Sequence, residues 1–202
     1  MDGSTASVAV KKLLFLVNGI PGTLGTPLLE KLRASEHEVH SIQSRLEDHD
    51  ALKDELARLK IPTGVDKAVL IPLAAITSLP ECEKNPDLAW IINVTATAEL
   101  AIQASHWAKQ HGLDFYAVGI SSSHVYREAP SPHRLTETDP TGPRSHYGRT
   151  KLGMEEALQT AAQTESFPCG ILRVFGILGV DQPPHFLLPG LIRRAAAKDF
   201  SQ

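Results

Sequence analysis

Short apolar runs alternate with amphipathic segments along the chain. The runs have the length of strands buried on both faces, and the amphipathic segments repeat their apolar residues at helical spacing. This pattern predicts strands at 12–17, 39–43, 68–73, 114–120 and 170–175, and helices at 28–34, 48–60, 86–111, 146–164 and 186–198. No tight hairpin signal joins two strand patterns. The alternation therefore predicts an α/β protein with a doubly wound parallel sheet of Rossmann type.

Capping residues and prolines predict where several of these elements end. Asp48 is an expected N-cap, and so is Asn85, which is followed by Pro86 at the first helical position. Gly112 is expected to close that long helix. Pro72 cannot donate to a sheet and is expected to mark the end of its strand. Outside the elements we expect a flexible lead-in at 1–11, a loop at 121–145 and one domain over 12–202.

Composition and charge exclude several classes of protein. With 202 residues, 42% of them hydrophobic and 21% charged, the chain can bury one well-filled core. Its longest apolar run, at 68–76, is nine residues long, against the roughly 20 that cross a bilayer, and the start does not resemble a secretory signal. The 20 basic and 23 acidic residues are well mixed, and the two cysteines are too few for a zinc cage. We expect a cytoplasmic protein with no metal site and no membrane or nucleic-acid partner.

A glycine loop joins the first predicted strand to the first predicted helix. Gly19, Gly22 and Gly25 are spaced as Gly-x-x-Gly-x-x-Gly. Glycines there permit a sharp turn, a close approach of the backbone to a pyrophosphate, and close packing of helix on strand. The exposed amides and the helix dipole then attract phosphate. The alternative is that these glycines only punctuate a turn.

A tyrosine, a lysine and a serine form the second candidate for chemistry. Tyr147 and Lys151 stand at i and i+4, on one face of a predicted helix. A nearby ammonium favours the phenolate, which suits acid–base catalysis. Ser122 follows the fourth predicted strand, at the sheet edge where open α/β sheets place ligand groups. Taken alone, the pair could be surface residues of an amphipathic helix, and the serine an ordinary loop residue.

Together and in this order, these motifs resemble the extended short-chain dehydrogenase/reductase superfamily. Within it, the chain is most similar to the sugar-nucleotide reductases of the dTDP-4-dehydrorhamnose reductase type. The resemblance covers roughly residues 12–198. Its specific stretches are the glycine loop and 73–78, 82–86, 93–97, 121–126, 137–140 and 147–151.

The resemblance implies NAD or NADP as cofactor and a nucleotide-linked sugar as substrate. The function implied is that of an oxidoreductase or epimerase that transfers hydride. Tyr147 would be the acid/base, Lys151 would lower its pKa and hold the nicotinamide ribose, and Ser122 would orient the substrate oxygen. The implied cofactor-binding residues are Gly19, Gly22, Thr23, Leu24, Gly25, Arg45, Leu46, Leu73, Ala74, Ala75, Asn93, Tyr147, Lys151 and Phe175.

Four positions depart from the family pattern. Asn18 replaces a threonine, which is a mild change, and Pro72 and Gly176 replace polar residues. Arg45 replaces an aspartate that commonly meets the adenine. It could contact the 2′-phosphate of NADP or be a solvated surface residue. His124 is expected to be a loop residue rather than a base.

The last departure is the end of the chain, because family members continue into a small lobe that binds the sugar nucleotide. The sequence stops at Gln202, so most of that lobe is expected to be missing. This leaves as alternatives a non-catalytic dinucleotide-binding regulatory or scaffold protein, and a truncated inactive isoform. A homodimer, or a partner that covers the missing lobe, would fit either case.

Overall fold

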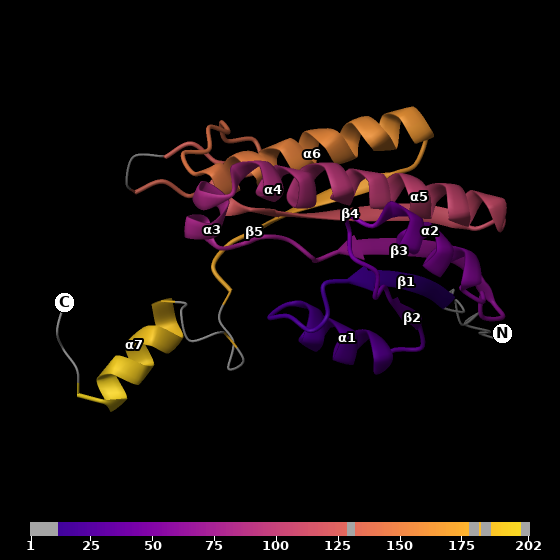
Figure 1. Ribbon diagram of the computed structural model, residues 1–202, viewed down its shortest axis with the longest axis horizontal. Helices are drawn as coiled ribbons and strands as arrows, with labels where there is room; N and C mark the ends of the chain where they lie inside the picture. The colour runs from indigo at the N-terminus through magenta and orange to yellow at the C-terminus, as the bar shows by residue number, and fades with distance from the viewer. Residues whose placement is uncertain (1–11, 129–131, 178–181, 183–186, 199–202) are drawn as a thin grey trace, which may run out of the picture.

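Five parallel strands form one sheet in the order β2-β1-β3-β4-β5 (Figure 1). The computed structural model describes residues 12–128, 132–177, 182 and 187–198. The expected lead-in at 1–11 and the expected helix start at Phe186 lie outside these residues. The strands are β1 (Lys12–Asn18), β2 (Glu38–Ser41), β3 (Val65–Pro72), β4 (Asp114–Ser122) and β5 (Cys169–Val174). The doubly wound parallel sheet predicted from the sequence is thereby confirmed.

Helices cover the two faces of the sheet unequally. α1 lies on one face, while α5 and α6 lie side by side on the other and α2 packs against α5 (Figure 1). The helical elements are α1 (Gly25–Arg33), α2 (His49–Arg58), α3 (Leu79–Lys84), α4 (Pro86–Trp90), η1 (Ile91–Ala96), α5 (Thr97–Gln110), η2 (Ser123–Val125), α6 (His146–Glu165) and α7 (Leu187–Ala196). α7 stands away from the sheet (Figure 1).

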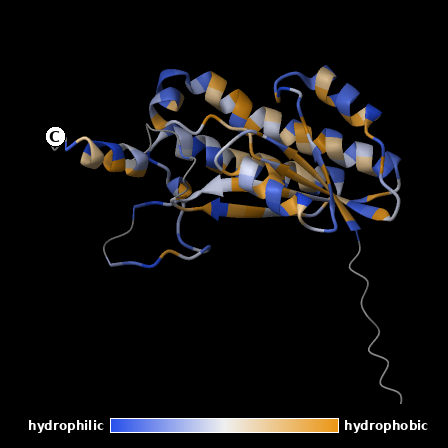
Figure 2. Ribbon diagram, turned by 90° about the horizontal axis from the view of Figure 1, so that it is seen from below, coloured by the Kyte–Doolittle hydropathy of each residue, from blue (hydrophilic) through white to orange (hydrophobic). Residues whose placement is uncertain are grey.

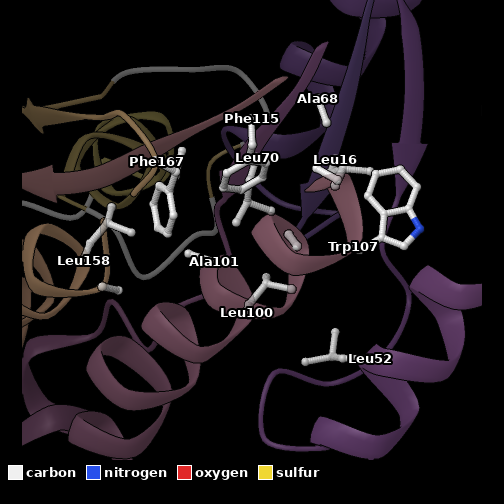
Figure 3. Close-up of a cluster of buried hydrophobic side chains, with 14 of the residues drawn as sticks. Leu16, Leu52, Ala68, Leu70, Leu100, Ala101, Trp107, Phe115, Leu158 and Phe167 are labelled. Atoms are coloured by element: carbon white, nitrogen blue, oxygen red, sulfur yellow. The ribbon is translucent and has the colours of Figure 1, made fainter. Parts of the chain in front are cut away.

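The core lies between the sheet and α2, α5 and α6. Figure 3 shows its side chains, among them Leu16 and Leu70 from the strands and Leu100 from α5. Phe115 and Phe167 meet edge to face, with ring centroids 5.2 Å apart. Figure 2 shows strands that are largely apolar and helices that carry both apolar and polar residues. This is the arrangement that the alternating pattern requires, because strands covered by helices must be apolar throughout.

Several predicted boundaries are confirmed and others are wrong. Asp48 caps α2 by accepting a hydrogen bond from the Ala51 N–H at 3.0 Å, and Gly112 follows α5 with a φ of +68°. β3 begins at Val65 rather than at 68, and β4 continues through Ser122. Ser121 and Ser122 belong to the sheet because they pair with β5, which a local pattern does not reveal.

The long helix predicted from Pro86 to Gly112 is present as one continuous helical segment, with a π-helical turn within it. It consists of α4, the π-helical turn η1 and α5, and the short helix α3 precedes it without having been predicted. Asn85 occupies the N-cap position of α4, but its side chain makes no capping bond and donates instead to Glu81 Oε1 of α3 at 2.5 Å. π-Turns within α-helices are frequent at functional sites, and η1 carries Asn93.

Candidate functional site

The strand order reverses between β1 and β3, and a cleft opens there at the carboxyl ends of the strands. This is the switch point at which open α/β sheets bind ligands. The cleft has a volume of about 320 Å³. It is lined by the segments that follow the first three strands: Asn18, Gly19, Ile20, Ile42, Gln43, Ser44, Arg45, Leu46, Glu47, Ala74, Ala75 and Ile76, together with Ile92.

The glycine loop is packed so closely at Gly19 and Gly25 that neither position can hold a side chain. Gly19 has a φ of +74°, and a Cβ there would lie 2.5 Å from the backbone nitrogen of Ala74. A Cβ on Gly25 would lie 2.6 Å from the carbonyl oxygen of Gly19. Gly22 is exposed, and Thr23 and Leu24 are half-buried in the turn that leads into α1. No acidic residue occupies the first turn of α1, so its positive end is open to an anion.

Asn18 ties the end of β1 to the segment after β3. Its Oδ1 accepts hydrogen bonds from the backbone N–H groups of Leu73 at 2.7 Å and Ala74 at 3.2 Å. Its Nδ2 is buried and has no partner among the described residues. A bound group with an acceptor atom would relieve that unpaired donor, since buried polar groups are normally hydrogen-bonded. Leu73 and Ala74 are thus positioned by Asn18, and the site fits a dinucleotide.

Arg45 and Leu46 lie on the opposite wall of the cleft. The Arg45 side chain is 84% exposed and lies 3.5 Å from a carboxylate oxygen of Glu47. Leu46 is buried in the core, so it forms part of the cleft floor. Its guanidinium is in solvent at the mouth of the cleft, a position that suits both a solvated surface residue and a contact with the 2′-phosphate of NADP.

The three expected catalytic residues come together where α6 meets the end of β4. Ser122 is the last residue of β4, and its hydroxyl accepts the N–H of His124 at 3.2 Å. The same side chain lies close enough to the Tyr147 phenol to act on its pKa. Lys151 Nζ donates to the Ile120 carbonyl at 2.9 Å and lies 6.0 Å from the centroid of the Tyr147 ring. The structure therefore brings Tyr147 and Lys151, one turn apart on α6, to the end of β4 that carries Ser122.

Burial determines the protonation of this group. It raises the pKa of Tyr147, against which the Ser122 side chain acts only in part. It lowers the pKa of Lys151 to about 8. The expected lowering of the Tyr147 pKa by Lys151 is not seen in the chain alone, because the desolvation of the phenol outweighs the other influences on it. The phenol of Tyr147 is accordingly protonated at neutral pH.

Asn93 has a positioning role in the structure. It is 1% exposed, and its amide binds the backbone of Ile76 through both Oδ1 (2.8 Å) and Nδ2 (2.9 Å). Nδ2 also donates to Thr150 Oγ1 at 3.0 Å, and that hydroxyl donates to the Tyr147 carbonyl. The amide expected to face a cofactor is therefore fully engaged within the chain. It joins the cleft segment after β3 to the helix that carries Tyr147 and Lys151.

A buried ion pair anchors the next turn of the same helix. Glu155 is 4% exposed, and its two oxygens accept from Arg173 Nε at 2.9 Å and Nη2 at 2.7 Å. Ser121 donates to the same carboxylate at 2.5 Å, and the Arg173 guanidinium lies 4.9 Å from the Tyr126 ring centroid. Tyr147, Lys151 and Glu155 thus bind the end of β4 at successive turns. Sequence reasoning missed Glu155, although its i+8 position from Tyr147 places it on the same face.

Close packing at the start of α6 brings the helix to the serine. A Cβ on Gly148 would lie 2.4 Å from the carbonyl oxygen of His124, so only glycine allows this contact. His124 itself lies in η2, and its ring meets the Tyr147 ring edge to face at 5.6 Å. The sequence analysis did not single out Gly148, because a glycine in a helical pattern does not reveal which distant backbone group it contacts.

Phe175, an expected cofactor-binding residue, follows β5. It is 54% exposed, and its ring centroid lies 6.3 Å from that of Tyr126.

The described residues show neither a metal cluster nor a membrane-spanning helix. They contain no group of three or more His, Cys, Asp or Glu side chains that could hold a metal ion. Within the same part of the chain, no helix combines the length and the apolar character needed to cross a membrane.

Comparison with known proteins identifies a family and several relatives. The model of the family described as RmlD substrate binding domain matches residues 13–195. A probable dTDP-4,6-dihydroxy-2-methyloxan-3-one 4-ketoreductase of Streptomyces antibioticus is 30% identical over 152 residues, which are 74% of this chain and 48% of that protein. A dTDP-4-dehydrorhamnose reductase of Mycolicibacterium smegmatis is 28% identical over 79% of this chain and 46% of its own length. The chain therefore spans about half the length of the curated relatives it matches.

Solved structures share the fold. RMD from Pseudomonas aeruginosa complexed with NADPH superposes with a TM-score of 0.73 at 24% identity, over 93% of this chain and 62% of that chain. A dTDP-4-dehydrorhamnose reductase from Clostridium acetobutylicum gives 0.71 at 24% identity, over 91% of this chain and 60% of that one.

Proposed function

The chain belongs to the family described as RmlD substrate binding domain, and from this premise we propose that it binds NAD or NADP and reduces a nucleotide-linked sugar. The observation that carries the proposal is the meeting of Ser122, Tyr147 and Lys151 beside the glycine-loop cleft. Related proteins named as sugar-nucleotide reductases support the choice of substrate class.

The expected cofactor-binding residues divide according to the parts of a dinucleotide. Backbone amides of the glycine loop, at Gly22, Thr23 and Leu24, would hold the pyrophosphate together with the positive end of α1. Gly19 and Gly25 keep the loop bare enough for that approach. The remaining contacts, to the adenosine and the riboses, are assigned to Arg45, Leu46, Leu73, Ala74, Ala75, Lys151 and Phe175. Arg45 would pair with a 2′-phosphate if the cofactor is NADP.

The chain's own residues would handle the proton. A nicotinamide cofactor, when bound, supplies the hydride that reaches the sugar carbonyl carbon. Tyr147 donates its phenolic proton to the carbonyl oxygen, which completes the alcohol. Ser122 holds that oxygen by a hydrogen bond, and Lys151 stabilises the phenolate left behind. The raised pKa of Tyr147 keeps the proton in place until the oxygen becomes basic, which suits reduction. The reverse transfer would serve oxidation or an epimerase.

Replacing Tyr147 with phenylalanine tests this assignment. Tyr147→Phe should lower turnover of a dTDP-linked 4-keto sugar with NADH or NADPH by about 10²-fold or more, because general acid catalysis is lost. Cofactor affinity, measured by fluorescence of the reduced nicotinamide, should stay within a few-fold. Tyr116→Phe, on β4 away from Ser122, is the matched control. Equal loss of turnover and cofactor binding would refute the role of Tyr147, and wild-type chain that binds neither cofactor would refute the proposal.

The proposal includes a cytoplasmic protein that forms a homodimer or has a partner over the substrate side of the site. Leu88, Trp90 and Ile91 are exposed apolar residues on α4 and η1, beside α6, and they support a contact with another chain. Sedimentation velocity of the purified chain measures its assembly state directly.

A further inference from the structure

Glu55, on α2, binds the turn that follows β2. Its Oε1 accepts the N–H of Gln43 at 3.0 Å, and its Oε2 accepts the N–H and the hydroxyl of Ser44 at 2.9 and 2.7 Å. His40 Nε2 lies 2.9 Å from Oε1. Four groups of one short segment therefore converge on a single carboxylate. These hydrogen bonds hold the pKa of Glu55 below its ordinary value despite partial burial.

The turn that Glu55 binds is one wall of the dinucleotide cleft. Gln43, Ser44 and the three residues after them line it. β2 ends at Ser41, and the Ile42 N–H donates to Val17 at 2.7 Å as the last backbone bond to β1. Beyond this bond, the N–H groups of Gln43 and Ser44 are satisfied by Glu55 instead of by the sheet.

Glu55 itself is held in place by the body of the molecule. α2 is capped by Asp48, and its Leu52 and Leu56 are buried in the core on the face next to Glu55. The Glu55 side chain is 17% exposed, and a second, open cleft of about 510 Å³ lies on its other side. Ser44 lines both clefts, so the Glu55–Ser44 contact forms part of the partition between them.

We propose that Glu55 is a positioning residue that shapes the cleft wall at Gln43–Glu47 for the adenosine half of the cofactor. The inference rests on the proposed function. A carboxylate suits the task because it offers two acceptor oxygens to three donors of the turn, and charge-assisted hydrogen bonds are stronger than neutral ones. Without it, two backbone N–H groups lose their acceptor and the turn is free to rearrange.

Glu55→Ala and Glu55→Gln test this with Asp54→Ala as the matched control. Asp54 is the neighbour on α2, and its exposed carboxylate is bonded to Arg58. In the full chain, Glu55→Ala should weaken NADH or NADPH about tenfold, the size expected for losing hydrogen bonds to a charged group. Glu55→Gln, which keeps the side-chain shape and one acceptor oxygen, should weaken them about threefold. Asp54→Ala should leave affinity unchanged.

Competition by half-cofactors separates positioning from general damage. In competition with the bound reduced cofactor, AMP should bind Glu55→Ala more weakly than wild type, by about the factor by which the cofactor itself is weakened. Nicotinamide mononucleotide should bind Glu55→Ala as tightly as it binds wild type. If AMP and nicotinamide mononucleotide are weakened equally, or if Glu55→Ala binds the cofactor as tightly as Asp54→Ala does, the positioning role of Glu55 is overturned and the proposed function still stands. Wild-type chain that binds neither NADH nor NADPH would overturn this inference together with the proposed function.

Discussion

Lys151 is almost fully buried between α6 and the end of β4, and its ammonium has one described acceptor, the Ile120 carbonyl. Taking an ammonium out of water disfavours its charged form, which is why its pKa falls to about 8. At neutral pH Lys151 therefore stays charged, and burying its ammonium lowers the free energy of unfolding. The same burial raises the pKa of Tyr147, so one physical cause sets both members of the pair.

Lys151→Met should reveal this through the pH dependence of stability. Below pH 8 both folded and unfolded chains carry the charge, and wild type bears the full burial penalty. Between pH 8 and about 10.4 the folded chain has released the proton and the unfolded chain has not, so wild type gains stability as pH rises. The gain of wild type relative to Lys151→Met should be about 2 kcal/mol between pH 7 and 9.5.

Urea unfolding of both chains at pH 7 and pH 9.5 measures this gain. Lys53→Met, an exposed lysine of α2, is the control and should show a constant difference from wild type. A Lys151→Met difference that is equally constant would contradict the buried charge. Comparing variants at each pH cancels most of the contribution of the other titrating groups.

At the scale of elements, α6 brings the candidate site together. Its N-cap Ser145 accepts from the Gly148 N–H at 3.0 Å, and Gly148 then packs against the carbonyl of His124 in η2. One turn later Lys151 reaches β4, and after another turn Glu155 reaches Arg173 on β5. The helix is therefore fixed in translation and rotation by contacts along a single face.

Two glycines of α6 make a matched pair for testing this packing. Gly148→Ala would place a Cβ against backbone, and relief requires moving η2 or the helix, so we expect a loss of roughly 2 kcal/mol of unfolding free energy. For Gly153→Ala the three atoms nearest the new Cβ all belong to the ring of Trp90, a residue that is 42% exposed and can shift toward solvent. Better helix propensity offsets that shift, so its effect should stay within about 1 kcal/mol. Equal effects in denaturant unfolding would contradict the contact with His124.

Across the whole molecule, packing is concentrated between the sheet and α2, α5 and α6. β5 is an edge strand of the described sheet, and Leu172 on it is 55% exposed. α7 carries exposed Leu191 and Ile192 and stands apart from this body (Figure 1). The free energy of folding should accordingly depend on the body and little on α7.

Alanine substitutions at buried and exposed apolar positions test that division. Leu100→Ala, in α5 at 0% exposure, should lower the unfolding free energy by about 2–5 kcal/mol, because it leaves a cavity in the core. Ile192→Ala, at 60% exposure in α7, should change it by less than about 0.5 kcal/mol. A large effect of Ile192→Ala on the unfolding midpoint of the purified chain would show that α7 packs against something in solution.

The sequence by itself determined the alternation of strands and helices, the parallel sheet and the glycine loop. These features depend on periodicity and on short spacings, which neighbouring residues display directly. The grouping of Ser122, Tyr147 and Lys151 came instead from the resemblance to a family, because each motif alone left other interpretations open. The sequence also placed the Asp48 cap correctly, because a cap involves residues three positions apart. The end of β4 was out of its reach, because pairing with β5 decides it, and the short helix α3 and the π-helical turn η1 were not predicted.

Only the tertiary structure decided how the candidate site is supported. Asn18 binds Leu73, Asn93 binds Thr150, and Glu55 binds Ser44 across separations of 55, 57 and 11 residues. The direction in which the pKa of Tyr147 shifts also depended on burial of the phenol rather than on the spacing to Lys151. Such contacts join side chains to distant backbone groups, and their energy comes from the burial that folding creates. No local pattern encodes that burial, so the positioning residues became visible only in three dimensions.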